Sequence, residues 1–268
     1  MRVLVATDLS DAGMLAIETL LGCNPELFGA VTLLHVIAAE EYMADISAEE
    51  IMRFAEERLG EEAAGLEQAG FMVEHRIEQG PAAERVQKVA DEIGADLIVV
   101  TDRGRSGAPG RLLGSTSEKI ALAGDTPVYV ERVEERDANW CRLGAKAPFA
   151  RPYIAADIDE GLPRVARVVS RLPGVAEVRV AHVASSARSS LDEREFIANE
   201  IAATPIGGAE IAVLHGSDPA KTIMKDAEMF GATLIALAPR RHGIVGRVVF
   251  GSVALSLLRE SRLPLLFA

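Results

Sequence analysis

The chain contains one pattern of elements twice, and this internal repeat limits its possible folds more than any other feature of the sequence. Five landmarks occur in the same order in both halves: an apolar run ending in aspartate, a strand-like run carrying a histidine, a buried strand-like run, a glycine-serine pair and a short apolar run after proline. They lie at Asp8 and Asp157, His35 and His182, 95–100 and 232–237, Gly114-Ser115 and Gly251-Ser252, and 127–130 and 264–267. The second copy is shorter, because 40–69 has only a brief counterpart near 191–203. The repeat predicts two tandem copies of one structural unit.

Each half alternates strand-like and helix-like segments. In the first half we expect strands at Arg2–Thr7, Ala30–Ile37, 72–78, 96–101 and Val128–Glu131, and helices at Asp11–Leu21, 47–69, Ala82–Ile93 and Ser115–Ala123. The strands are nearly continuous runs of Val, Ile and Leu, which indicates burial on both faces. The predicted fold class is α/β: two tandem doubly wound, five-stranded parallel sheets, the second copy shorter and degenerate.

The domain boundaries follow from the same pattern. We expect a first domain at 1–131, a linker at 132–150 and a second domain at 151–268, because 132–150 shows no periodicity and mixes charges with Gly and Pro. Trp140 in this linker is expected to anchor it to a domain rather than to contact a ligand. Both halves end in short apolar strands, 128–130 and Leu265–Phe267. Since a bare apolar edge strand is normally paired, we expect these two strands to pair and make the chain an intramolecular pseudo-dimer.

Composition excludes several classes of protein. Of the 268 residues, 49% are apolar and 25% are charged, as in a folded globular chain, and no apolar run is long enough to span a bilayer. The net charge of −12 and the presence of only three Tyr and one Trp oppose binding to nucleic acid. The acidic residues are concentrated in 40–67, which we expect to be a solvated helix face.

The cysteines and the N-terminus bear on location. Cys23 and Cys141 are the two cysteines, and they form no C-x-x-C or Cys/His cluster, which excludes a disulfide framework or a zinc module and indicates the reducing cytoplasm. A strand-like run begins at Val3, which leaves no room for a signal peptide. No side chains have the spacing of metal ligands, and His35 and His182, at equivalent strand ends, are expected to bond to backbone.

A glycine-rich loop after the fourth strand is the strongest sign of a ligand site. The loop 101–110 leads through Gly114 into a helix that opens with three hydroxyl residues. Glycines let backbone N–H groups approach an anion, and a helix N-terminus adds free donors, so this is the pattern of a phosphate cradle. Asp8, Val36 and Thr101 end the first, second and fourth strands, where ligands bind in such sheets. The alternative is a flexible loop capped by Ser115.

Together these residues resemble the universal stress protein family. The resemblance rests on Asp8 after the first strand, on Leu34-His35-Val36-Ile37, and on Gly104 with nine residues before Gly114-Ser115, and it extends over both halves. A tandem member, in which a fused pair replaces the usual homodimer, is implied. The resemblance implies ATP as the cofactor, accompanied by Mg²⁺, with no catalytic and no metal-ligating residue. The implied binding residues are Thr7, Asp8, Val36, Val100, Thr101, Gly104, Gly114, Ser115, Thr116 and Ser117.

Within this implied site, Asp8 and Val36 would hold adenine and ribose, and Gly104 to Ser117 would hold the phosphates. One position departs from the family pattern Gly-x-x-Gly-x9-Gly-Ser/Thr, because Thr101 stands at the first glycine.

The second half departs much further from that pattern. Ala238 and Arg241 replace the two leading glycines, and Pro239 removes a backbone donor, while Asp157 and Gly251-Ser252 are kept. Two interpretations remain: a site that no longer binds and serves as scaffold, or an altered site in which Arg240, Arg241 and His242 hold a different anion. In either case we expect at most one ATP per chain.

Three classes of function follow. The leading one is a non-catalytic protein that binds ATP or another adenine nucleotide and acts in stress response through its nucleotide state, with an unidentified protein partner and no membrane. The second is a nucleotide-free scaffold of the same fold, and homodimers of the chain fit either class. The third is a slow ATPase or adenylating enzyme, which needs a carboxylate at the phosphates; Asp102 is the nearby candidate, between Thr101 and the basic residues Arg103 and Arg105.

Overall fold

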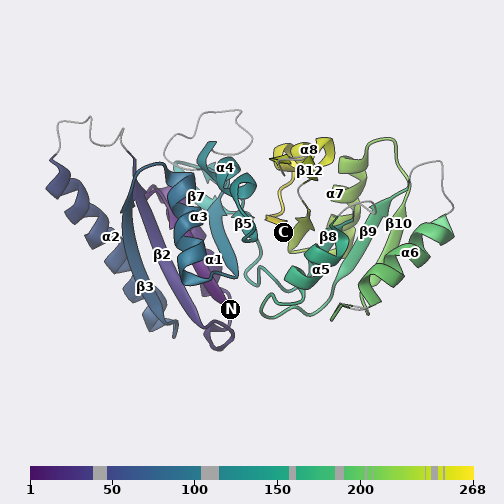
Figure 1. Cartoon of the computed structure of the whole chain (residues 1–268), viewed down its shortest axis with the longest axis horizontal. Helices are drawn as coiled ribbons and strands as arrows, with labels where there is room; N and C mark the ends of the chain where they lie inside the picture. The colour runs from purple at the N-terminus through teal and green to yellow at the C-terminus, as the bar shows by residue number, and fades with distance from the viewer. Residues whose placement is uncertain are drawn as a thin grey trace. The chain divides into compact units, whose positions relative to one another are not determined.

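The fold is known from a computed structural model, which describes residues 1–38, 47–103, 115–156, 161–184, 190–202, 204–206, 208–238, 240–242, 247–249 and 251–268. The chain divides into two compact units, Met1–Lys146 and Ala147–Ala268, coloured purple to teal and teal to yellow in Figure 1. Each unit is an α/β fold, and each is described below by itself.

In the first unit the described strands are β1 (Arg2–Thr7), β2 (Ala30–Ile37), β3 (Val73–Gln79), β4 (Leu97–Thr101) and β5 (Val128–Glu131). The helices are α1 (Asp11–Leu21), α2 (Ala48–Gln68), α3 (Ala82–Ile93) and α4 (Ser115–Ala123), with a 3₁₀ turn at Pro25–Leu27. The strands are parallel in the order β5-β4-β1-β2-β3. Right-handed crossovers place α1 and α2 on one face and α3 beside α4 on the other, so that Val3, Leu4 and Val5 of β1 are fully buried.

The second unit repeats this topology. Its parallel sheet has the order β10-β9-β8-β11-β14, from β8 (Pro152–Ala155), β9 (Arg179–Val183), β10 (Glu210–Leu214), β11 (Leu234–Leu237) and β14 (Leu265–Phe267). Its helices are α5 (Leu162–Val169), α6 (Ser190–Ala202), α7 (Pro219–Phe230) and α8 (Ser252–Glu260). The predicted fold class, two tandem doubly wound parallel sheets, is confirmed. The second copy is the shorter one, since α6 has 13 residues and α2 has 21.

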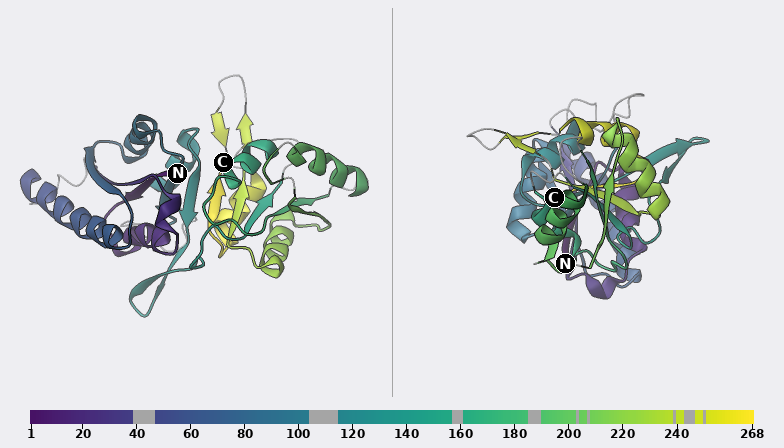
Figure 2. Two further views of the ribbon diagram at one scale, coloured as in Figure 1. Left: turned by 90° about the horizontal axis from the view of Figure 1, so that it is seen from below. Right: turned by 90° about the vertical axis from the view of Figure 1, so that its right-hand side faces the viewer.

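Two antiparallel hairpins add to this topology. Strands β12 (Arg240–His242) and β13 (Arg247–Val249) follow β11 in the second unit, where the first unit has its glycine-rich loop (Figure 2). Strands β6 (Val133–Arg136) and β7 (Asn139–Arg142) follow β5 in the first unit. Neither hairpin was predicted from the sequence.

The segment 132–150 is therefore not structureless, although we expected a linker there. Asp137 and Ala138, with φ of 49° and 61°, make the turn of the β6–β7 hairpin. Hairpin turns of this kind usually carry Asn-Gly or Asp-Gly, so Asp-Ala gave no signal. Trp140 packs against Ala12 and Leu15 of α1, which fits its expected anchoring role.

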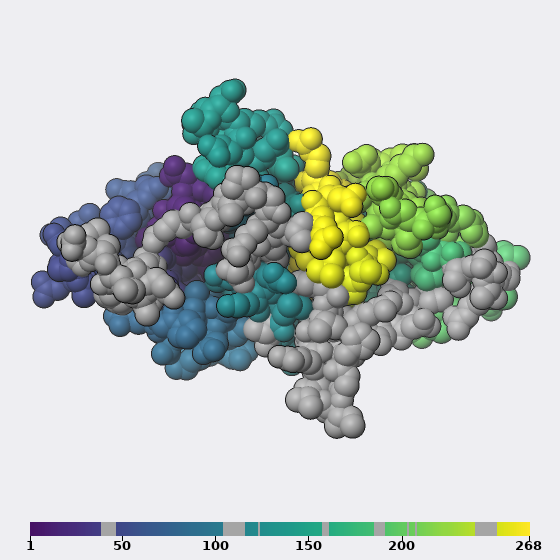
Figure 3. All heavy atoms as spheres, turned by 90° about the horizontal axis from the view of Figure 1, so that it is seen from above, coloured from purple at the N-terminus to yellow at the C-terminus, as the bar shows by residue number. Residues whose placement is uncertain are grey.

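The start of helix α2 is stabilised by its own side chains. Ser47 and Glu50 form a capping box at the start of α2: the Ser47 hydroxyl accepts from the Glu50 N–H, and the Glu50 carboxylate accepts from the Ser47 N–H. Most of α2 is exposed, and Figure 3 shows it in blue on the surface of the first unit, as expected for its acidic residues. No helix in the described ranges has both the length and the apolar character needed to cross a bilayer.

Strands β5 and β14 close the sheets of their own units, each beside β4 or β11. The expected pairing of β5 with β14 concerns how the two units meet, and it stays a prediction, as does the pseudo-dimer.

Candidate functional site

The carboxyl ends of β1, β2 and β4 bring the expected binding residues to one edge of the first sheet. Thr7 at the end of β1 lies opposite His35 of β2, and Val36 is the next residue along β2. Strand β4, which ends in Val100 and Thr101, flanks β1 on its other side. The crossover from β1 runs to β2 and the crossover from β4 runs to β5, in the opposite direction, so the edge between β1 and β4 is the switch point at which doubly wound sheets bind ligands.

Asp8 is held in place by the start of helix α1. Its Oδ1 accepts hydrogen bonds from the backbone N–H of Ser10, at 3.1 Å, and from the Ser10 hydroxyl, at 2.5 Å. The same Ser10 oxygen caps α1 by accepting from the N–H of Gly13, at 3.0 Å. A Cβ on Gly13 would lie 2.2 Å from Asp8 Oδ1, so glycine at this position makes room for the carboxylate. The Asp8 carboxylate is thus fixed at the strand end before any ligand arrives.

Thr7 and Val36 form the buried floor of this edge. The Thr7 hydroxyl accepts from the Leu9 N–H, at 3.1 Å, and lies 3.5 Å from the sulfur of Met14. Leu9 has a positive φ of 60°, which turns the chain sharply into α1. The carbonyl of Thr7 bonds to Nδ1 of His35, at 3.0 Å, as expected for a histidine at a strand end. Val36, 8% exposed, adds an apolar residue at the end of the neighbouring strand β2.

Thr101 and Ser117 connect the end of β4 to helix α4. The Ser117 hydroxyl donates to the Thr101 carbonyl, at 2.9 Å, and the Thr101 hydroxyl donates to the Arg103 carbonyl, at 2.5 Å. Both hydroxyls are therefore used within the protein, whereas the side chain of Thr116 is exposed on the first turn of α4. Gly104 and Gly114, with the loop between them, lie outside the described residues, and Ser115 is described only as the first residue of α4.

Asp102 has a structural contact that the sequence did not suggest. Its side chain, buried beside the start of the hairpin, accepts from the Val133 N–H, at 3.0 Å, and pairs with the guanidinium of Arg132, at 3.3 Å. Burial raises the pKa of this carboxyl above 3.8, while the charge of Arg132 lowers it in part. Asp102, the carboxylate that an ATPase would need at the phosphates, is thus engaged with the β6–β7 hairpin.

A second buried carboxylate holds the other end of this hairpin. Glu131, fully buried at the end of β5, accepts from Arg142 Nη2, at 2.7 Å, and from the Thr19 hydroxyl, at 3.0 Å, with one oxygen. Its other oxygen accepts from the backbone N–H groups of Arg132, at 3.0 Å, and Gly144, at 3.1 Å. The only hint in the sequence was a charged residue ending an apolar strand.

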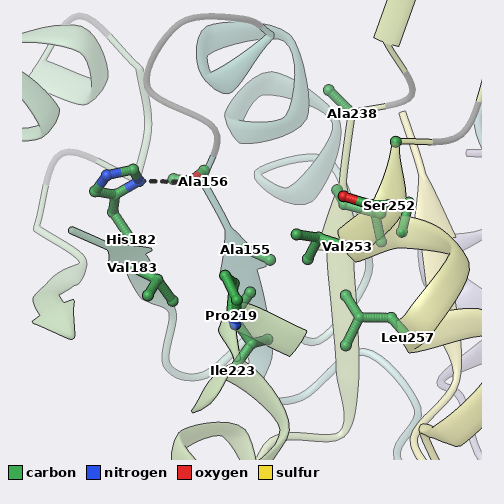
Figure 4. Close-up of a pocket in the computed structure, with 13 residues that line it drawn as sticks. Ala155, Ala156, His182, Val183, Pro219, Ile223, Ala238, Ser252, Val253 and Leu257 are labelled. Atoms are coloured by element: carbon green, nitrogen blue, oxygen red, sulfur yellow. Dashed lines mark hydrogen bonds between the residues drawn. The ribbon is translucent and has the colours of Figure 1, made fainter. Parts of the chain in front are cut away.

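The corresponding edge of the second unit contains a cavity. His182 Nδ1 bonds to the Ala156 carbonyl at 3.0 Å, the same contact and distance that His35 makes with Thr7, so the two units superimpose in register here. The cavity measures about 200 Å³ and lies at the ends of β8, β9 and β11 (Figure 4). Its lining residues are Ala155, Ala156, His182, Val183, Pro219, Ile223, Leu237, Ala238, Gly251, Ser252, Val253, Ala254 and Leu257.

The anion-binding interpretation of the second half rests on residues that the structure describes only in part. Arg240, Arg241 and His242 form β12, but their side chains lie outside the description, as does all of Asp157. Among the described residues of both units, no three His, Cys, Asp or Glu side chains gather as metal ligands do.

Both halves of the chain match one protein-family model. The model of the Universal stress protein family matches residues 1–132 and 164–268. Universal stress protein MJ0577 from Methanocaldococcus jannaschii is 29% identical over 150 residues, which cover 48% of this chain and 93% of that protein. Stress response protein NhaX from Bacillus subtilis is 26% identical over 174 residues, which cover 64% of this chain and 96% of that protein.

A solved structure shares the whole fold. The universal stress protein from Archaeoglobus fulgidus covers 100% of this chain with 95% of its own length, at a TM-score of 0.76 and 24% identity. The two segments that match the family model fall within the two compact units, which have the same strand order. Since these segments make up most of the sequence, the chain belongs to the universal stress protein family and carries the family's domain twice.

Proposed function

We propose that the first unit binds ATP without turning it over, and that the protein acts in stress response through its nucleotide-bound or empty state. The observation that carries this proposal is the fixed position of Asp8, whose carboxylate is held by Ser10 at the switch point between β1 and β4. A carboxylate at this place accepts hydrogen bonds from ribose hydroxyls, and the apolar side chain of Val36 on the neighbouring strand suits an adenine ring.

The phosphates would follow the glycine-rich loop into helix α4. Gly104 and Gly114 would leave backbone N–H groups open to the phosphate oxygens, and Ser115 and Thr116 would add donors at the N-terminus of α4. Mg²⁺ would accompany the phosphates.

Thr101 at the family's first glycine is compatible with this arrangement. Its hydroxyl is turned onto the Arg103 carbonyl, and its side chain is 5% exposed, so it takes little space at the surface where a nucleotide would lie.

The contacts of Asp102 support binding of ATP without turnover. Hydrolysis needs a group that positions or deprotonates water at the terminal phosphate. The carboxylate of Asp102 is occupied by Arg132 and by the Val133 N–H, so this residue is not available for that role.

The test is a calorimetric titration of ATP into the wild type and Gly114→Arg. An arginine side chain would fill the volume of the phosphates, and we expect a loss of more than about 2 kcal/mol of binding free energy, the value of several charge-assisted hydrogen bonds. The matched control is Gly60→Arg in α2, where nothing lies within 4 Å of an added Cβ. Equal affinity of wild type and Gly114→Arg would contradict the proposal, and no binding to the wild type would favour the nucleotide-free scaffold.

A further inference from the structure

The cavity of the second unit differs in chemistry from the edge of the first unit that it repeats. The shared contact of His35 and His182, together with Gly114-Ser115 and Gly251-Ser252, sets the correspondence between the two. In this register four hydroxyl residues of the first unit become apolar in the second. Thr7 corresponds to Ala156, Thr101 to Ala238, Thr116 to Val253 and Ser117 to Ala254.

Apolar side chains from three sides line the cavity. Val253 and Leu257 of α8 lie across it from Ala155 of β8 and Ile223 of α7, as Figure 4 shows. Leu237, 5% exposed, closes the end of β11. Among the described lining residues only Ser252 carries a hydroxyl, so a phosphate here would depend on the backbone N–H groups at the start of α8 to replace its hydrogen bonds to water.

His182 and Ser252 carry the polar side chains among the described lining residues, and both ring nitrogens of His182 are directed at the protein. Its Nδ1 bonds to the Ala156 carbonyl, at 3.0 Å, and its Nε2 lies 3.8 Å from a carboxylate oxygen of Glu193. Glu193 is 1% exposed, and neither of its oxygens has a hydrogen-bond donor in the described part of the chain. A carboxylate buried so close to the lining opposes an anionic ligand by charge repulsion.

We propose that this cavity is a separate binding site for an uncharged aromatic molecule of about the size of indole. An apolar cavity of about 150 Å³ can bind benzene, and the volume here, about 200 Å³, leaves room for a somewhat larger ring. The proposal does not depend on ATP binding in the first unit. It replaces the anion that we considered for the second half with a ligand that has no charge.

The test is a titration of indole into the full-length protein, followed by calorimetry and by NMR of methyl groups. We expect shifts of the methyl groups of Val183, Val253 and Leu257, with those of Val36 and Val100 unchanged. Shifts at Val36 and Val100 instead, or no binding of indole, would overturn the proposal.

Two variants of Val253 make the test specific to the cavity. Val253→Phe should fill it and weaken indole binding at least about tenfold. Val253→Thr keeps the shape of the side chain but adds a hydroxyl without a partner, and it should weaken indole binding several-fold. This variant still tests the cavity if Val253→Phe does not fold. Arg259→Phe, on the exposed last turn of α8, is the matched control and should stay within about twofold of the wild type. Equal affinity of Val253→Phe and wild type would refute the assignment.

ATP titrated into the same variants separates this proposal from the proposed function. Val253→Phe should bind ATP as the wild type does, because the nucleotide site is in the other unit. If no variant binds ATP while indole binding follows the pattern above, the proposed function fails and the second site stands.

Discussion

Glu131→Gln should destabilise the first unit far more than its single-atom change suggests. Both oxygens of Glu131 accept hydrogen bonds, from Arg142 Nε and Nη2, from the hydroxyls of Thr19 and Tyr129, and from the N–H groups of Arg132 and Gly144. Whichever way the amide is turned, its NH₂ group meets donors, and the Arg142 charge, mostly buried, loses its partner. Breaking a buried ion pair in this way costs about 3–5 kcal/mol.

The assay is urea unfolding followed by tryptophan fluorescence. Trp140 is the only tryptophan in the sequence and lies in β7, packed on α1, so its signal reports on the first unit. The free energy of unfolding of a unit of this size falls by about 2 kcal/mol per M of urea, so the urea concentration at the unfolding midpoint should fall by about 1.5–2.5 M. In the Arg142→Gln background the same substitution should cost clearly less, because the charge is already gone.

Glu134→Gln is the matched control. Glu134 pairs with Arg136 at 2.8 Å in the same hairpin, close to the 2.7 Å of Glu131 and Arg142, but both partners are exposed. Exposed pairs contribute little, so its midpoint should stay at the wild-type value within error. If Glu131→Gln and Glu134→Gln shift the midpoint equally, the reasoning from burial is refuted.

Three further predictions test the site and its surroundings. Gly13→Ala should weaken ATP binding and leave the unfolding midpoint nearly unchanged, because the added Cβ would displace the Asp8 carboxylate and not the backbone. An unaltered ATP affinity in calorimetry would speak against a role for Asp8. Burial raises the pKa of Cys23 to about 11, from 9.0, so in a Cys141→Ser background its alkylation by iodoacetamide at pH 8 should be about 100-fold slower than for an ordinary thiol and should accelerate as the pH rises toward 11. Titration of ATP should give one site per chain, and two equivalent sites would contradict the inequality of the two units.

The parts of the fold that follow from local patterns were predicted well. Strands β1, β2 and β5 and helices α1, α3 and α4 have the expected bounds, because continuous apolar runs mark the strands and helix-like patterns lie between them in the sequence. Strand β3 begins at Val73 instead of Met72, and α2 ends at Gln68. Differences of one residue at element ends are expected, since end residues have few interactions that decide their conformation.

The hairpin β6–β7 could not be predicted, because what stabilises it is distant in sequence. Arg142 is held by Glu131 and by the Glu18 carbonyl, at 3.1 Å, and Trp140 by residues of α1. None of these contacts leaves a periodic pattern in 132–150. The same reason applies to Asp102, which was placed near the phosphates from its position after β4, while its partner Arg132 comes from the next strand end.

For the site residues, the sequence predicted positions in the sheet but not hydrogen-bond partners. The position of Asp8 and Val36 at one sheet edge followed from strand order alone, and the structure adds how Ser10 and Gly13 fix the carboxylate. The role of Ser117 at the phosphates stays a prediction. The structure adds that its hydroxyl donates to the Thr101 carbonyl, a contact between a helix turn and a strand end that spacing does not reveal.

The short covalent connection after the β6–β7 hairpin also bears on how the sequences of the two halves can differ. The carbonyl of Lys146 lies so close to Gly22 of the first unit that an added Cβ on Gly22 would collide with it. The carbonyl of Ala150 accepts a hydrogen bond from the N–H of Ala176 in the second unit. Residues 147–149 therefore connect a segment held by the first unit to a segment held by the second. So short a tether keeps each half at an effective concentration of about millimolar or more relative to the other, at a fixed one-to-one ratio. In a symmetric dimer of identical chains every substitution appears in both copies. Covalent joining removes that constraint, so Ala156 and Val253 could replace hydroxyl residues in one half while Thr7 and Thr116 persist in the other.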